Sequence, residues 1–347
     1  MEPLVDKIDI GLNGKCISGL MLGTSTLYAN KNCSSILDAA VEYGINTFDL
    51  APSHLSSDKV KEWMRNFRKK DPETFNKLVF VIKGGFPIEE KPGYYCSQLT
   101  GNSTTIARNM QKSLEEALAF YELPKADIFM LHRDDEDYEY NSIVKREKTP
   151  VETIYEATRQ LSPFYSIPAI SNWQDDRALE FSNLMGKENP LICSSYFSLW
   201  ERNGIPWHGE VSYTHENLMN TSYLPNCIIL PYSPLGGFFG SRICLGGVEE
   251  INKYCDEDGP DSITQLIIHD KNREKYKRLK QYTEQLNDKS MTSYSPLQMT
   301  IAYCLGHPRV TSAFTCVKSM EQLENNIKGY LLSKLIPSTD LPFLNLG

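Results

Sequence analysis

The sequence has no apolar run that approaches the roughly 20 residues needed for a membrane-spanning helix. Its first residues, MEPLVDKIDI, lack the basic and then apolar order of a secretory signal, so we expect no targeting segment and no membrane partner. Basic residues are also few, since 36 Lys and Arg against 44 Asp and Glu give a net charge of −8. Nucleic-acid binding normally needs a basic patch, so we predict no nucleic-acid partner.

Cysteine pairs at redox or metal-binding spacing are missing as well. The nine cysteines are scattered and include no Cys-x-x-Cys pair. An odd number without such spacing favours reduced thiols and a cytoplasmic location. No two histidines have the spacing of zinc ligands, so we also expect no metal.

A glycine-rich fingerprint after an early strand, which is typical of a doubly wound dinucleotide-binding sheet, is not present. Instead, eight short apolar runs alternate with segments of helical periodicity. This alternation predicts an α/β fold of parallel strands with right-handed crossovers. Eight units favour a closed (β/α)8 TIM barrel, in a single domain that spans residues 1–347. The predicted strands are 19–22, 45–49, 78–83, 127–131, 167–171, 191–195, 227–231 and 311–315.

Residues 7–18 are predicted to form a β-hairpin that plugs the barrel, because Ile8 and Ile10 alternate with polar neighbours and Asn13-Gly14 supplies a tight turn. The predicted helices are 35–43, 106–121, 151–161, 177–185, 263–286 and 296–305. Four stretches are too long for plain connections, and we expect them to be loops over the barrel mouth. They are 85–103, 134–149, 199–225 and 236–261.

Several apolar runs end on, or just before, a residue that can take part in chemistry. Asp49, Lys83 and His132 stand at the ends of three runs, and Ser171-Asn172 at the end of a fourth. The carboxyl ends of parallel barrel strands meet at one face of the fold, where barrels build their active sites. We therefore expect these side chains to converge on one active site.

Six motifs, in this order and at barrel spacing, resemble the aldo-keto reductase superfamily. They are Leu22-Gly23-Thr24, Gly44-Ile45-Asn46-Thr47-Phe48-Asp49, Val81-Ile82-Lys83, Leu131-His132, Ile170-Ser171-Asn172 and Tyr232-Ser233-Pro234-Leu235-Gly236. The resemblance extends from about residue 18 to residue 328 and implies NAD(P)H-dependent interconversion of a carbonyl and an alcohol. Residues 131–135, followed by 171–173, are similar to a bacterial branch often linked to sugar-like substrates.

The resemblance implies a catalytic set of Asp, Tyr, Lys and His. Asp49, Lys83 and His132 match three of these, but His54 stands where the Tyr is expected, five residues after Asp49. A phenol with a pKa near 10 needs a nearby ammonium to act as an acid at neutral pH, whereas an imidazole with a pKa near 6.5 does not. Three outcomes stay open: a working acid/base with a shifted pH optimum, a base that favours alcohol oxidation, or vestigial carbonyl reduction.

The resemblance also implies a set of cofactor-binding residues. They are Gly23, Thr24, Asp49, Ser171, Asn172, Ser194, Tyr232, Ser233, Leu235, Lys318, Gln322 and Asn326. Tyr232 would stack on the nicotinamide, and Ser194 stands where a Gln usually binds the carboxamide. Lys318, at the start of a helix that can attract anions, would bind a 2′-phosphate. This favours NADP(H), with NAD(H) as the alternative.

Aromatic residues in the predicted mouth loops are expected to form the walls of the substrate site. They are Tyr28, Trp173, Phe197, Trp200, Trp207 and Phe238. As a set they favour a small carbonyl or alcohol substrate that is sugar-like or cyclic. Two other readings stay open: a nicotinamide-binding sensor or partner subunit with little turnover, and a redox-neutral epimerase that retains its cofactor. The sequence leaves open the physiological substrate, the direction of the reaction and the oligomeric state.

Overall fold

The computed structural model describes residues 3–12, 14–29, 32–140, 142–201, 209–237, 240–241, 243–244, 247 and 270–345. Eight parallel strands form one sheet in the order β13-β12-β11-β8-β5-β4-β3-β14. These strands are β3 (Met21–Gly23), β4 (Thr47–Leu50), β5 (Val79–Gly84), β8 (Ala126–Leu131), β11 (Tyr165–Ser171), β12 (Leu191–Ser194), β13 (Cys227–Ile229) and β14 (Phe314–Cys316). Each strand lies where the sequence predicts one.

The sheet closes on itself between its first and last strands. On one side, β14 pairs with β3, so that Thr315 lies opposite Leu22. On the other side, the Thr311 N–H donates to the Ile229 carbonyl at 3.0 Å and the Phe314 N–H to the Pro231 carbonyl at 2.9 Å. The predicted (β/α)8 barrel is thereby confirmed.

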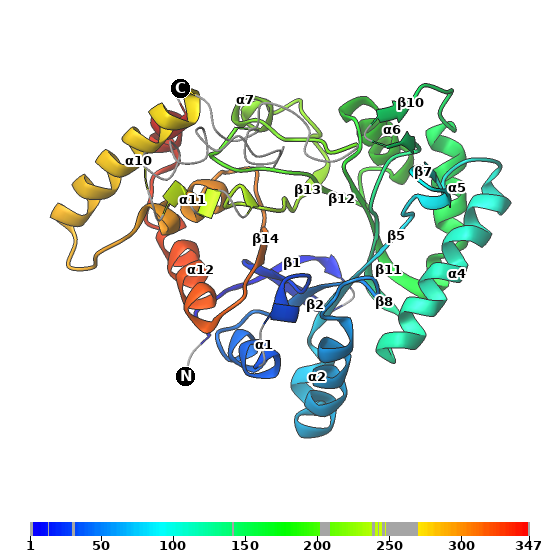
Figure 1. The fold of residues 1–347 in the computed structure, drawn as a ribbon, viewed down its shortest axis with the longest axis horizontal. Helices are drawn as coiled ribbons and strands as arrows, with labels where there is room; N and C mark the ends of the chain where they lie inside the picture. Colours follow the sequence, from blue (N-terminus) through cyan, green and yellow to red (C-terminus); the bar gives the residue numbers. More distant parts are fainter. Residues whose placement is uncertain are drawn as a thin grey trace.

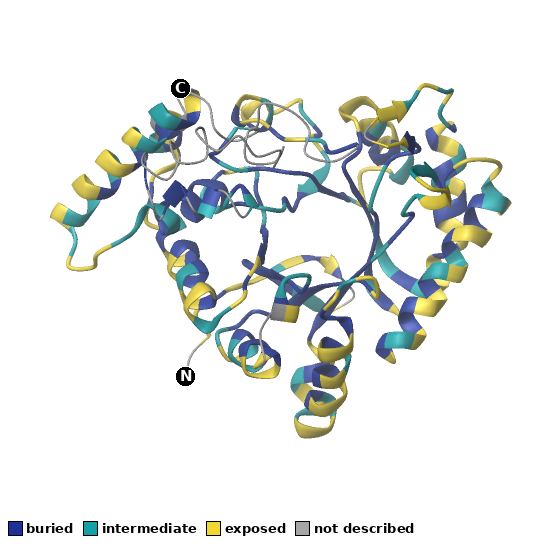
Figure 2. Ribbon diagram, viewed as in Figure 1, coloured by how far each residue is buried: buried dark blue, intermediate teal, exposed yellow. Residues whose placement is uncertain are grey.

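Helices surround the barrel (Figure 1). The longer ones are α1 (Cys33–Glu42), α2 (Ser57–Lys70), α4 (Ser103–Tyr121), α5 (Val151–Gln160), α6 (Asp175–Met185), α10 (Asp270–Lys289), α11 (Pro296–Leu305) and α12 (Met320–Ser333). The short ones are η1 (Leu27–Ala29), α3 (Pro72–Asn76), η2 (Ser162–Phe164), α7 (His215–Met219), η3 (Ser338–Asp340) and α13 (Leu341–Asn345). Figure 2 shows buried residues on the faces that pack against the strands and exposed residues on the outer faces. Among the described helices, none is both long and apolar enough to cross a bilayer.

One predicted helix is described only in part, and one of the longer observed helices was not predicted. The predicted helix over 263–286 is described from Asp270 onward, and residues 263–269 lie outside the described part. The sequence analysis did not assign α2, although Val60, Trp63, Met64 and Phe67 have helical spacing and are buried.

The hairpin fills one end of the barrel interior. β1 (Lys7–Leu12) and β2 (Lys15–Ser18) pair antiparallel, as predicted. Their Leu12 and Ile17 side chains pack with barrel-lining residues such as Val79 and Ile128. The ammonium of Lys15 donates to the Leu78 carbonyl at 2.8 Å, just before β5 begins. The hairpin therefore closes the amino-terminal end of the barrel, and ligands must enter at the opposite end, which we call the mouth.

Two predicted mouth loops form regular structure together, so the expectation of plain loops is corrected. Residues 85–103 contain β6 (Ile88–Lys91) and β7 (Tyr94–Cys96), and residues 134–149 contain β9 (Asp137–Glu139) and β10 (Ser142–Val144). These strands form an antiparallel sheet in the order β10-β9-β7-β6, which we call the mouth sheet. Pairing between the two segments satisfies backbone N–H and C=O groups that would hydrogen-bond to water if the segments were separate loops.

The other two predicted mouth loops are described incompletely. In the stretch 199–225, residues 202–208 lie outside the described part, and α7 begins at His215. In the stretch 236–261, the structure describes 236–237, 240–241, 243–244 and 247.

Buried charges tie the mouth sheet to the barrel. Arg146 forms ion pairs with Asp135 at 2.7 Å and with Asp137 at 2.6 Å, and the Asp135 side chain is 0% exposed. Burial alone would raise the pKa of both carboxyl groups, but hydrogen bonds from Arg146 and from backbone N–H groups lower it overall. A buried carboxylate that loses its only strong cationic partner is costly, so Arg146 should matter more than a surface arginine.

We expect Arg146→Met to lower the free energy of unfolding by about 3–5 kcal/mol at pH 7, because it leaves two buried carboxylates without their arginine. The folded-state pKa of each Asp is depressed, so its contribution is present above the unfolded-state value near 3.9 and is lost as the pH falls toward the lower folded-state value. The difference between wild type and variant should therefore shrink only as the pH falls below about 4. Urea unfolding at pH 7 and at about pH 3 measures it.

The matched control is Arg159→Met, because Arg159 is 65% exposed and its ion pair with Glu156 is 3.5 Å long. This change should cost less than about 1 kcal/mol. Equal losses for the two variants would show that the buried network does not stabilise the fold.

Candidate active site

One cavity of about 720 Å³ lies at the mouth, and the ends of the barrel strands line it. The strand register explains why distant residues meet there. Lys83 lies opposite Met130, two residues before His132, and Ser171 lies opposite Ser194. Asp49, His54, Lys83 and His132 all line this cavity. The structure thus brings together the four residues that the sequence assigned to catalysis.

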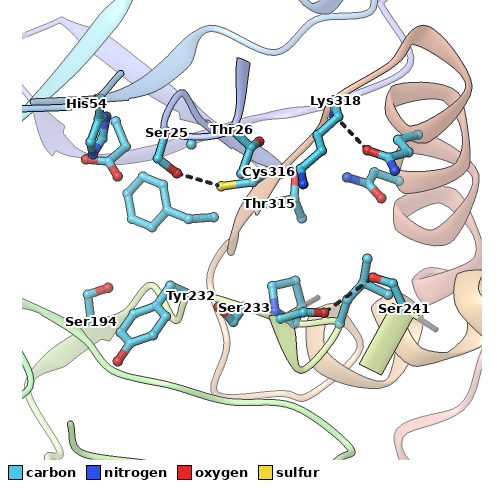
Figure 3. Close-up of a pocket in the computed structure, with 18 of the residues that line it drawn as sticks. Ser25, Thr26, His54, Ser194, Tyr232, Ser233, Ser241, Thr315, Cys316 and Lys318 are labelled. Atoms are coloured by element: carbon cyan, nitrogen blue, oxygen red, sulfur yellow. Dashed lines mark hydrogen bonds between the residues drawn. The ribbon is translucent and has the colours of Figure 1, made fainter. Parts of the chain in front are cut away.

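The cavity is an elongated cleft. Figure 3 shows His54, Ser194 and Tyr232 toward one end, and Lys318 and Ser241 toward the other. We call the end with His54 the catalytic end, after the role predicted for its residues, and the end beside the amino terminus of α12 the far end.

A buried ion pair lies at the catalytic end. The Lys83 ammonium is 2.7 Å from Asp49 Oδ2, and the two side chains are 18% and 9% exposed. They come from β5 and β4, which are neighbours in the barrel. Asp49 Oδ1 is buried and has no hydrogen-bond partner among the described residues. The pair therefore places one cation and one unsatisfied carboxylate oxygen beside the histidines.

His54 stands in the turn that follows β4. Its Nδ1 is 3.3 Å from the Thr24 hydroxyl, and its backbone N–H donates to the Ala51 carbonyl at 3.0 Å. Burial lowers the pKa of His54 below its usual 6.5; Asp49 opposes this shift, and Lys83 adds to it. The pKa predicts a neutral imidazole at pH 7, so the side chain has a lone pair to offer.

His132 follows β8 and packs against Phe86. The two ring centroids are 4.3 Å apart with the planes tilted by 30°, and the His132 backbone N–H donates to the Gly84 carbonyl at 2.9 Å. Burial, with Lys83, Arg133 and His54, lowers the pKa of His132 well below its usual 6.5. Its Nδ1 is buried without a partner in the described part of the chain. His132 is therefore a neutral group that can orient an oxygen atom.

Asn172 joins three barrel segments near the catalytic end. Its Oδ1 accepts from the Tyr232 hydroxyl at 2.6 Å and from the Val211 N–H at 3.3 Å, and its Nδ2 donates to the His132 carbonyl at 3.3 Å. The residue has a φ of +60°, a conformation that asparagine tolerates better than most residues. Asn172 lines the cavity, but its amide already makes these three bonds within the protein.

The far end is built on the first turns of α12. The Ser319 hydroxyl caps the helix by accepting from the Gln322 N–H, and Gln322 Oε1 accepts from the Lys318 N–H at 2.7 Å. Asn326 lines the cleft and is 2% exposed, yet its Nδ2 has no partner among the described residues. A helix amino terminus favours anions, and the unpaired amide can donate to a ligand.

Most of the predicted cofactor-binding residues line the cleft, but Thr24 does not. Gly23, Asp49, Ser171, Asn172, Ser194, Tyr232, Ser233, Leu235, Lys318, Gln322 and Asn326 are all at its surface. Thr24 is fully buried, and its hydroxyl donates to the Asp49 carbonyl at 2.8 Å. The expectation that Thr24 contacts the cofactor is therefore corrected: it contacts catalytic residues from behind.

The four predicted aromatic walls that the structure describes do not line the cleft. Trp173, Phe197 and Trp200 are buried at 3%, 1% and 0% exposure, because these large apolar rings pack in the core. Tyr28 is 45% exposed and lies outside the cavity lining. Trp207 and Phe238 are outside the described residues. Assignment to the mouth loops thus wrongly placed Trp173 and Trp200 in the substrate site.

Other residues line the cleft that sequence reasoning did not select. They are Ser25, Thr26, Arg133, Ser241, Cys316 and Asn325. Ser25 and Thr26 follow β3 closely, and Cys316 ends β14, so the rule that selected Asp49 and Lys83 could have found them. Ser241 carries no comparable signal. Arg133 follows His132, and its Nη1 is buried without a partner in the described part of the chain.

The sequence model of the Aldo/keto reductase family matches residues 18–161. This stretch begins with the last residue of β2, ends just after α5 and includes Asp49, His54, Lys83 and His132. No curated protein matches the chain.

We expect Gly236→Ala to destabilise the loop that carries Ser233 and Leu235. Gly236 has a φ of +75°, and an added Cβ would lie 2.8 Å from Cδ1 of the buried Trp200. Gly11→Ala is the matched control, because Gly11 has a φ of +77° but nothing within 4 Å of the added Cβ. The Gly236 variant should lose about 1–3 kcal/mol more than the control in urea unfolding. Equal losses would mean that Trp200 does not restrict this loop.

Proposed function

Because the chain belongs to the aldo-keto reductase superfamily, whose members are NAD(P)H-dependent oxidoreductases, we propose that it interconverts a carbonyl and an alcohol with His54 as the acid/base. The observation that carries this proposal is the meeting of Asp49, Lys83, His54 and His132 in one cleft. The family match covers the first four strand-and-helix units, β3 to α5, and the closed barrel contains four more strands.

The cleft residues fit a nicotinamide dinucleotide. The cavity is elongated and polar at both ends, and the buried Asn326 amide lacks a partner among the described residues (Figure 3). At Gly23, a Cβ would lie 2.6 Å from Cys316 Sγ, so glycine keeps this wall open. Tyr232, Ser171 and Ser194 would hold the nicotinamide, Ser233 and Leu235 the pyrophosphate, and Gln322 and Asn326 the adenosine. When bound, the cofactor supplies or accepts the hydride.

The residues of the chain would stabilise and orient the substrate oxygen and transfer its proton. Asp49 holds the Lys83 ammonium by their 2.7 Å contact, which fixes a positive charge beside the reacting oxygen. His132, packed against Phe86, would orient that oxygen. His54 would give a proton to the oxygen during reduction and take it during oxidation.

We propose NADP(H) as the cofactor. Lys318 is exposed at the cleft beside the capped amino terminus of α12, where a 2′-phosphate would meet a cation and helix N–H groups. Glu321 lines the same end and opposes an anion, so NAD(H) is the alternative.

We propose a small, oxygen-rich substrate such as a sugar. The buried aromatic residues no longer support this class. Arg133 Nη1 does, because it lies at the cleft, has no partner within the described ranges and can donate to hydroxyl or other oxygen groups. We also propose a cytoplasmic location, because the cysteines that the structure describes are unpaired.

We expect His54→Ala to lower kcat by about 10²–10⁴-fold, because the general acid/base is lost. In wild type, reduction needs protonated His54, so its rate should fall as the pH rises through a pKa below 6.5, and oxidation should rise through the same pKa. His54→Tyr should move the reduction limb toward the phenol range near 10. The measurement is a panel of sugars, ketones and aldehydes with both cofactors, from about pH 5 to pH 10.

Ser53→Ala is the control, because Ser53 is the exposed neighbour of His54 in the same turn. Equal rates in wild type and His54→Ala would remove His54 from the mechanism. If neither wild type nor His54→Tyr turns over any substrate, but both bind NADPH and quench its fluorescence, the chain is a nicotinamide sensor. Cofactor that stays bound through extensive washing would favour the redox-neutral epimerase.

We expect Lys318→Met to raise the KM for NADPH by about 10–100-fold, since a charge-assisted contact of roughly 1.5–3 kcal/mol is lost, and to leave the KM for NADH nearly unchanged. Lys328→Met, an exposed position farther along α12, is the control. Equal changes for NADPH and NADH would contradict the preference for NADP(H).

A further inference from the structure

The buried Thr24 hydroxyl lies between two groups that can accept a hydrogen bond, the Asp49 carbonyl and the His54 ring. Its Oγ1 is 2.8 Å from the Asp49 carbonyl oxygen and 3.3 Å from His54 Nδ1. Thr24 itself is fixed, because its carbonyl accepts from the Ser56 hydroxyl at 2.6 Å and from the Leu27 N–H at 3.1 Å. Thr24 Oγ1, the Asp49 carbonyl oxygen and His54 Nδ1 therefore form a short hydrogen-bonded chain, and the position of each proton in it can be deduced.

A threonine hydroxyl has one proton, and a carbonyl oxygen only accepts. Two oxygens 2.8 Å apart need a proton between them, so the Thr24 proton goes to the Asp49 carbonyl. Toward His54, Oγ1 then has only lone pairs to offer. A hydrogen bond there requires the proton on Nδ1, which leaves Nε2 of the neutral ring unprotonated.

We propose that Thr24 is a positioning residue that holds the proton of neutral His54 on Nδ1, so that the Nε2 lone pair is directed to the substrate and takes the proton when an alcohol is oxidised. The catalytic role of Nε2 rests on the proposed function, whereas the position of the proton rests on the Thr24 geometry alone. Thr24 does not line the cleft and acts only through His54.

The surroundings of His54 agree with this assignment. Nε2 has no hydrogen-bond partner in the described part of the chain, and His54 lines the cleft at its catalytic end (Figure 3). The charged and titratable groups that act on the ring are Asp49 from β4, Lys83 from β5, and His132 after β8. Burial and Lys83 disfavour a charged ring, and Asp49 favours it. Near pH 7 and above, the base form is therefore the one that meets a substrate.

The atoms and electrons of the oxidation balance with one co-reactant, an oxidised nicotinamide. The alcohol gives its hydroxyl proton to His54 Nε2 and a hydride from the carbinol carbon to the oxidised nicotinamide. The O–H and C–H bonds break, the carbon–oxygen double bond forms, and the alcohol is oxidised as the nicotinamide is reduced. His54 leaves the step doubly protonated, beside the Asp49 carboxylate, and releases its proton to solvent.

The position of the proton can be measured on the free protein by ¹⁵N NMR of histidine-labelled samples at pH 8. His54→Gln identifies the resonances of His54. We expect Nδ1 to be protonated and Nε2 unprotonated in wild type and in Thr24→Ser, which retains the hydroxyl. In Thr24→Val, which has a similar shape without the hydroxyl, a share of the molecules should carry the proton on Nε2 instead. A wild-type ring protonated on Nε2 would overturn the proposal, whether or not the protein turns over a substrate.

The catalytic consequence is tested with any alcohol that the panel identifies. Thr24→Val should lower kcat for oxidation by about 10–100-fold above the pKa of His54, within the range that a general base contributes, with a smaller change in KM. Thr24→Ser should restore the rate and the pH profile. Equal kcat values and pH profiles in the Val and Ser variants, with both folded by circular dichroism, would overturn the role of Thr24. NMR shifts as expected without turnover in any variant would instead count against the proposed function.

Discussion

The site depends on the buried ion pair between Asp49 and Lys83. These residues end neighbouring parallel strands, so their 2.7 Å contact is set by the register of the barrel and not by a mobile loop. The pair also affects the pKa of the neighbouring histidines. Lys83 disfavours charge on both His54 and His132, while Asp49 favours it on His54. Burial is the larger cause of the lowered pKa values of both histidines, and this one contact between two strands adds to it or opposes it. A buried pair is costly unless its geometry is good, and the closed barrel supplies that geometry.

The barrel itself could be predicted from the sequence because its strands are short apolar runs that end at turn residues or chemically active residues. Such runs are visible without a partner, as in Val79–Gly84, where all but Lys83 are buried. The mouth sheet could not be predicted, because all four residues of Ile88–Lys91 are exposed and carry no alternation. Its strands are specified by pairing between two distant segments, which local periodicity does not report.

The rule that strand ends carry chemistry found Asp49, Lys83 and His132, since it depends only on where an apolar run stops. The mouth-loop assignment failed for Trp200, because a position in a loop does not say whether a ring faces the cleft or the core. The family resemblance gave Thr24 the wrong contact. The resemblance placed Thr24 among cofactor-binding residues, and only the two distances from its hydroxyl show that it faces Asp49 and His54.

The mouth sheet links two segments, residues 85–103 and 134–149, that follow different barrel strands. β7, after β5, pairs with β9, after β8, so Tyr94 lies opposite Glu139, and Arg146 fastens the second segment through its aspartates. Insertions in surface loops are usually tolerated one at a time. Here an insertion in either segment would shift the pairing of both. Anyone who grafts new specificity onto this barrel should therefore transplant the two segments as one unit.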